Sequence, residues 1–104
     1  MEVIRLEKKE TKKETLIDQA EQVLSFLNDK TGRRFPIRNP LGRPTANADV
    51  IMARLKEGYT AEQCRQVIAR KCRDWLDDDK MSKHLTPETL FRRSNFERYI
   101  GECV

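Results

Sequence analysis

Residues 58–91 read GYTAEQCRQVIARKCRDWLDDDKMSKHLTPETLF, and this stretch decides the fold of the chain. Gly58 is a helix-ending signal, and Thr60 begins the next helix through a Thr-x-x-Gln capping box. The helix expected over residues 61–76 places its apolar side chains on one face: Cys64, Val67, Ile68, Cys72, Trp75 and Leu76. Three successive aspartates then oppose the helix dipole, and the Thr-Pro-Glu of residues 86–88 starts another helix. The stretch therefore predicts short helices joined by tight corners.

Helical signals also dominate the rest of the chain. Residues 15–30 repeat apolar side chains at helical spacing, namely Ile17, Ala20, Val23, Leu24 and Leu27. Either Thr11 or Thr15 begins this helix, and Gly32 ends it. A shorter helix is expected over residues 46–57, and the aromatic side chains near the C-terminus are expected to fold back onto the third helix. No segment alternates like a strand, so we predict an all-α bundle of four to five short helices.

The composition predicts one small soluble domain. The 104 residues are 38% hydrophobic and 37% charged, and no run approaches the roughly 18 apolar residues that span a bilayer. Residues 1–14 are charged throughout, so we expect a lead-in or linker there and the helical domain over residues 15–104. The three cysteines are odd in number, and two of them lie on the apolar helix face. This pattern argues against a disulfide framework and favours an intracellular protein.

The segment between the first two helices carries the positive charge of the chain. Residues 32–46 read GRRFPIRNPLGRPTA and contain three prolines and two glycines, so regular structure is not expected. Residues 32–48 hold four arginines and no acid, which equals the net charge of +4 of the whole chain. We predict a long basic loop that Phe35, Ile37 and Leu41 anchor to the core. Loops of this length in small domains are often functional.

Arginine side chains are the candidate binding groups. A guanidinium binds phosphate through its fork of N–H donors, and an exposed aromatic ring such as Phe35 stacks on a base. The candidates for nucleic-acid contact lie on the loop, on the third helix and near the C-terminus: Arg33, Arg34, Arg38, Arg43, Arg65, Arg70, Arg73, Arg92 and Arg93. They form one interface only if the fold brings them to one face. The alternative is that Phe35 is buried and that the arginines keep a small basic protein in solution.

Patterns typical of catalytic and metal sites are missing from the sequence. His84 is the single histidine, and Cys64 and Cys72 are two helical turns apart, about 12 Å by helix rise. One zinc ion cannot bridge them along one straight helix, and no Cys-x-x-Cys pair is present. The glycine-rich loop of a nucleotide hydrolase is missing too. We therefore expect that the protein is not an enzyme and that it holds neither a metal nor a cofactor.

Further motifs stand in a fixed order along the chain. They are VLSFLNDKTGRRF at residues 23–35, IMARLKEGYT at 51–60, KMSKHLTPETLF at 80–91 and NFERYI at 95–100, with the pairs Val67-Ile68 and Trp75-Leu76 between them. On these residues the chain resembles the conserved C-terminal domain of phage and prophage replication proteins, which are called replisome organisers or DnaD-like replication initiation proteins. The resemblance covers about residues 20–102. It departs at His84, where the family usually has an aromatic residue, and at Arg92-Arg93-Ser94, which replaces a shorter connection.

The resemblance implies a non-catalytic part in starting phage DNA replication in the cytoplasm of the bacterial host. In such proteins the C-terminal part engages DNA, the replicative helicase or the helicase loader. One expected function is DNA binding through the basic loop and the helix face. The alternative is recruitment of the host helicase or its loader through an exposed apolar patch that uses Leu41, Met52 or Met81.

Two further expectations follow from the resemblance. The domain usually follows an N-terminal DNA-binding module, so we expect this chain to be either an excised domain or a stand-alone remnant. The family supplies no catalytic residue. The shared residues each have a structural interpretation, and they are Leu27, Asn28, Gly32, Tyr59, Trp75, Pro87, Leu90 and Phe91.

Overall fold

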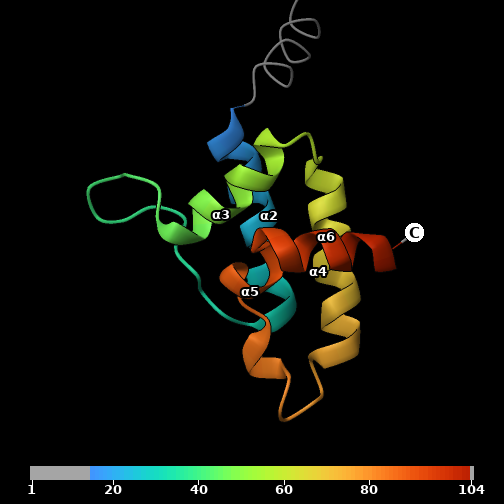
Figure 1. Ribbon diagram of the computed structural model, residues 1–104. Coiled ribbons are helices and arrows are strands. Elements are labelled where there is room, and N and C mark those ends of the chain that lie inside the picture. Colours follow the sequence, from blue (N-terminus) through green and yellow to red (C-terminus); the bar gives the residue numbers. More distant parts are fainter. Residues whose placement is uncertain (1–14, 104) are drawn as a thin grey trace, which may run out of the picture.

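The computed structural model describes residues 15–103 and shows a bundle of short helices (Figure 1). The described chain forms α2 (Leu16–Thr31), α3 (Ala46–Lys56), α4 (Ala61–Trp75), a 3₁₀ turn η1 (Ser82–His84), α5 (Pro87–Phe91) and α6 (Arg93–Glu102). This part of the chain contains no strand and a single isolated bridge between Arg38 and Pro44. The predicted all-α class is confirmed. The charged lead-in over residues 1–14, with the start signal at position 11, lies outside the described residues.

Side-chain caps begin the two long helices where the sequence predicts. The hydroxyl of Thr15 accepts a hydrogen bond from the amide of Asp18, and the Asp18 carboxylate accepts one from the Thr15 amide. Thr60 and Gln63 form the same reciprocal pair at the start of α4. Each pair satisfies two backbone amides, one at the cap and one in the first turn, and so defines the residue at which the helix begins.

Two glycines in left-handed conformations shape the ends of α2 and α3. Gly32 has a φ of 73°, and its amide donates to the carbonyl of Asn28. Gly58 has a φ of 106° between α3 and α4. Residues with a Cβ rarely adopt these angles, which explains glycine at both positions. Tyr59 follows and packs edge-on against Phe96 with ring centroids 4.8 Å apart, so this corner also contacts α6.

The chain beyond α4 forms two helices, where the sequence predicted one short helix and a fold-back. The hydroxyl of Thr86 caps α5, and Pro87 occupies the first helical position. Arg92 has an extended ψ of 136°, which separates α5 from α6. Tyr99 of α6 is buried and lies edge-on to Trp75 of α4, with ring centroids 5.8 Å apart. The fold-back onto α4 is confirmed, and it takes the form of a helix.

The core lies where α2, α3, α4 and the two C-terminal helices meet. Its fully buried side chains come from all five helices: Val23, Leu24, Leu27, Ile51, Val67, Ile68, Leu90, Phe91 and Phe96. Cys64 and Cys72 are buried on the same face of α4, and both are free thiols. None of the helices described here combines the length and apolar character needed to cross a membrane.

The segment between α2 and α3 projects from the bundle, at the left of Figure 1. Its first part is anchored, because the Asn28 side chain donates to the Phe35 carbonyl at 3.2 Å and accepts from the Phe35 amide at 2.9 Å. Phe35 and Ile37 pack half-buried against the core. Leu41 is 77% exposed, so the prediction that it anchors the loop is wrong. The turn around Leu41 is closed by its own hydrogen bonds and needs no contact with the core.

Candidate nucleic-acid interface

Arg33 opens the loop and is held by the protein itself. Its guanidinium donates to the carbonyl of Leu85 at 3.0 Å and to the carbonyl of Ser82 at 2.9 Å. The residue is half-buried. These bonds tie the start of the loop to the segment around η1, before α5. We therefore assign Arg33 a structural role and leave it out of the candidate interface.

Arg34, Arg38 and Arg43 are the exposed arginines of the loop. The side chains of Arg34 and Arg43 have no hydrogen-bond or ion-pair partner among residues 15–103. Arg38 donates from one guanidinium nitrogen to the carbonyl of Gly42 at 3.0 Å, and its other donors have no acceptor among the described residues. No carboxylate of the described chain pairs with any of the three, so their charges remain available to a phosphate.

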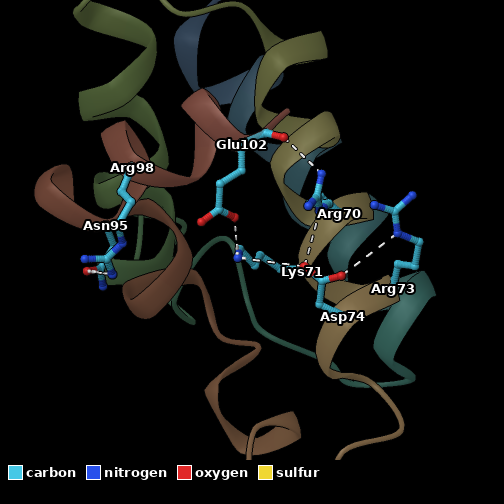
Figure 2. A network of polar contacts seen from close by, with 7 residues as sticks. All are labelled: Arg70, Lys71, Arg73, Asp74, Asn95, Arg98 and Glu102. Atoms are coloured by element: carbon cyan, nitrogen blue, oxygen red, sulfur yellow. Dashed lines mark hydrogen bonds and ion pairs between the residues drawn. The ribbon is translucent and has the colours of Figure 1, made fainter. Parts of the chain in front are cut away.

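Three basic residues of α4, Arg70, Lys71 and Arg73, instead belong to a network of polar contacts that reaches the end of α6 (Figure 2). Arg70 donates to the Asp74 carboxylate at 3.3 Å and to the backbone carbonyl of Glu102 at 2.9 Å. Lys71 Nζ lies 2.6 Å from a carboxylate oxygen of Glu102. Arg73 is 70% exposed and lies 4.0 Å from Asp74. Carboxylates therefore offset part of the positive charge on this face.

The two arginines at the start of α6 also have carboxylate partners. Arg92 lies 3.1 Å from Glu88. Arg93 lies between two acids, 3.3 Å from Glu97 and 3.6 Å from Glu57. These pairs are solvent-exposed and contribute little to stability, but they lower the net charge that a polyanion would meet.

Arg65 stands in acidic surroundings. It lines a shallow surface depression together with Asp18, Glu21 and Asp29 of α2. A phosphate near Arg65 would also meet these carboxylates. Apart from Arg33, the candidate arginines thus fall into two groups. Those of the loop have no acidic partner within residues 15–103, and those of the helices lie among acids.

A family model matches most of the described chain. It is described as the conserved phage C-terminus, and it matches residues 23–101. The chain belongs to the conserved phage C-terminus family. Neither the comparison with curated proteins nor the comparison with solved structures found a match. The match runs from α2 into α6, so the exposed loop arginines lie inside the region that the family model covers.

The residues expected to determine the fold have structural roles in this conserved phage C-terminus domain. Leu27, Leu90 and Phe91 are fully buried. Asn28 brackets the backbone of Phe35 with two hydrogen bonds. Trp75 packs on α6 through its ring, as described above. These residues build the scaffold that presents the loop.

The sequence analysis did not predict that two cations are buried in the fold. Lys71 is 5% exposed, and its Nζ lies 4.3 Å from the ring centroid of Tyr99 and 4.9 Å from that of Trp75. Arg54 is 6% exposed and donates to the carbonyl of Phe91 at 2.9 Å, which joins α3 to α5. The signal was present in the helical periodicity, because each cation stands three residues after a core isoleucine and directly before another core residue.

The thiols of α4 are shielded rather than activated. Burial raises the pKa of Cys64 to about 12, although the charges of Arg65 and Arg54 act in the opposite direction. Burial also raises the pKa of Cys72. Thiols of this kind are poor nucleophiles and poor metal ligands. Within the described part of the domain, no three His, Cys, Asp or Glu side chains are grouped closely enough to hold a metal ion.

Proposed function

We propose that this domain is a non-catalytic DNA-binding module of a phage DNA replication initiation protein. The observation that carries the DNA-binding part is the contrast between the arginines. Four of the helix arginines, Arg70, Arg73, Arg92 and Arg93, pair with carboxylates. Arg34 and Arg43 of the loop are exposed, and their side chains have no partner among the described residues. The replication role rests on the motif resemblance and agrees with membership of a phage family.

Charge distribution supports DNA as the partner. The segment of residues 32–48 has four arginines and no acid, and all four lie in the loop before α3, which projects from the helical body (Figure 1). A guanidinium that keeps its donors free can form forked hydrogen bonds with a phosphate group. Phe35 packs against the core, so base stacking by this ring is not part of the proposal.

The test is a salt titration of duplex DNA binding with a variant that removes the two loop arginines whose side chains have no partner in the described part of the chain. In an Arg34→Ala/Arg43→Ala double variant, we expect weaker binding at every salt concentration. The slope of log K against log salt should fall by about two, because each lost phosphate contact removes about 0.9. Fluorescence anisotropy between about 50 and 200 mM salt measures both quantities.

The matched control is an Arg92→Ala/Arg93→Ala double variant. It removes the same charge from α6, where both arginines have acidic partners. We expect its affinity to stay within about twofold of the wild type, because its ion pairs already neutralise these side chains. Wild-type affinity that does not change with salt, or equal losses in both variants, would reject the loop as the DNA-binding surface.

The alternative function, recruitment of the host replicative helicase or its loader, needs an exposed apolar surface. Of the three side chains expected to form it, Met52 packs half-buried against the core and Met81 is half-buried. Of these three, only Leu41 is mostly exposed, at 77%. We therefore favour DNA, and retention of a helicase or loader by the purified domain without DNA binding would reverse this preference.

A further inference from the structure

The tip of the loop is a small hydrogen-bonded finger, residues 38–44. The amide of Asn39 donates to the carbonyl of Arg43 at 2.8 Å, and the amide of Gly42 donates to the carbonyl of Asn39 at 2.8 Å. The side-chain oxygen of Asn39 accepts from the amides of Leu41 at 2.9 Å and Arg43 at 3.0 Å. An isolated bridge between Arg38 and Pro44 closes its base. The finger is therefore ordered by its own bonds before it meets any partner.

Glycine at position 42 is part of this construction. Gly42 has a φ of 81°, a left-handed angle that favours glycine. Its carbonyl accepts from the Arg38 guanidinium, which places this arginine along the finger. Arg43 follows directly and has no side-chain partner in residues 15–103. Two arginines thus lie close to the tip on either side of the turn.

Leu41 occupies the tip and is the unusual residue of the finger. It is 77% exposed, whereas Leu76, the other large exposed apolar side chain of the described chain, is 41% exposed. A leucine held in water by an ordered turn loses the free energy of burial that it would gain in an apolar environment. An ordered turn with an apolar tip and flanking arginines is suited to a partner that offers both an apolar slot and phosphates.

Duplex DNA offers this combination at its base steps. Proteins that act on the minor groove combine arginine contacts with apolar wedges, including leucine, that partly unstack a base step and bend the duplex. A protein groove that accepts Leu41 would have to be acidic to tolerate the neighbouring arginines, whereas DNA supplies the negative charge on both strands. The charge of the finger favours DNA.

We propose that the finger of residues 38–44 inserts Leu41 as a wedge between base pairs of duplex DNA while Arg38 and Arg43 hold the flanking phosphates. This inference rests on the proposed function and specifies how the finger contacts the duplex. It assigns separate tasks to the residues: the arginines supply salt-dependent affinity, and Leu41 deforms the duplex. Binding should be strongest at pyrimidine–purine steps such as TA, because these steps unstack most easily.

The experiment compares the wild type with Leu41→Ser on a duplex that has a central TA step. A 2-aminopurine base beside the step reports unstacking, and a donor–acceptor dye pair at the two ends reports bending. We expect Leu41→Ser to bind about tenfold more weakly, which corresponds to the loss of one buried leucine contact. Unstacking and bending should disappear, while the dependence of affinity on salt should stay as in the wild type because the arginines remain.

Leu76→Ser is the matched control, since it makes the same change at the other exposed leucine. It should bind and bend DNA as the wild type does. A second variant, Asn39→Ala, removes two hydrogen bonds of the turn without removing a proposed DNA contact, and it should reduce bending if the ordered turn is needed.

The outcomes separate this inference from the proposed function. Salt-dependent binding by the wild type without unstacking, or unchanged bending in Leu41→Ser, rejects the wedge and leaves DNA binding by the loop intact. No salt-dependent DNA binding by the wild type rejects both. If Leu41→Ser abolishes retention of a helicase or loader while DNA binding is unchanged, the finger is a protein-binding element and the wedge is wrong.

Discussion

Arg33 and Arg34 are neighbours in the sequence, but their side chains have different environments in the structure. Arg33 binds the carbonyls of Leu85 and Ser82, whereas Arg34 is exposed and unpaired within the described chain. Two adjacent arginines therefore have different roles: Arg33 stabilises the fold, and Arg34 is part of the candidate interface. Sequence alone ranks them equally as phosphate ligands.

Alanine substitutions at this dipeptide should separate stability from binding. Arg33→Ala should lower the free energy of unfolding by about 2 kcal/mol, because it removes two hydrogen bonds from a charged donor. Arg34→Ala should leave stability within about 0.5 kcal/mol and weaken DNA binding, as surface substitutions rarely change stability. Urea unfolding and anisotropy measure the two effects. A stable Arg33→Ala variant with weakened DNA binding would show that Arg33 is a DNA ligand after all.

At the scale of elements, Lys71 links α4 to α6. Its ammonium lies over the rings of Tyr99 and Trp75. It also pairs with the Glu102 carboxylate, and Figure 2 shows this pair. The lysine is 5% exposed, and the side chain of Glu102 is 38% exposed. Removing Glu102 therefore leaves a buried ammonium, whereas removing the charge of Lys71 leaves a carboxylate that is partly in water.

Removing the Glu102 carboxylate should lower the free energy of unfolding more than removing the charge of Lys71. Glu102→Ala leaves a buried ammonium with weaker compensation and should destabilise the domain by about 1–2 kcal/mol. Lys71→Met keeps the apolar stem against the rings and should change the free energy of unfolding by less than about 1 kcal/mol. Urea unfolding of both variants tests this order. A larger loss for Lys71→Met would mean that the cation–π contacts dominate.

At the scale of the whole molecule, the core shields two of the three thiols from solvent. Cys64 is fully buried and Cys72 is 5% exposed, whereas Cys103 is half-buried near the end of α6. Because burial raises the pKa of Cys64 to about 12, only about one thiol in ten thousand would be ionised at pH 8. Reaction at Cys64 and Cys72 therefore requires opening of the bundle.

A thiol reagent should accordingly report the integrity of the fold. In native protein at about pH 8, Cys103 should react quickly and the two α4 thiols much more slowly, because thiolate is the reactive form. In urea all three should react at similar rates. Mass spectrometry assigns the labelled sites, and Cys103→Ser should remove the fast phase. Labelling of Cys64 as fast as Cys103 would show that α4 separates from the core in the native state.

Local signals predicted the helices well. The capping boxes at Thr15 and Thr60 and the glycines at 32 and 58 act over a few residues, so they can be read without knowing the rest of the fold. The repeat of apolar residues on α4 likewise predicted Cys64, Val67, Ile68 and Cys72 of its buried face. The same repeat was wrong for Leu76, which follows the end of the helix and is 41% exposed. The separation of α5 from α6 was missed, because the extended backbone at Arg92 has no strong local signal.

The candidate site was less predictable because it depends on partners. The nine arginines have similar chemistry, and some of their partners come from distant parts of the chain, such as Leu85 for Arg33 and Glu57 for Arg93. Other partners are one helical turn away, as in Arg70–Asp74 and Arg93–Glu97, and that spacing is visible in the sequence. The exposure of Leu41 also reversed its predicted role. Its turn satisfies its own backbone groups, and this was not apparent from the proline and glycine content.

The sequence by itself therefore determined the all-α class, the starts of α4 and α5, the ends of α2 and α3, and the placement of the positive charge on the segment between α2 and α3. These properties depend on interactions within a few residues or on composition. Only the tertiary structure decided which arginines are unpaired and which apolar residue stands in solvent. Whether a side chain is free to bind a partner depends on its tertiary contacts, and these contacts join residues as far apart in the sequence as Arg33 and Leu85.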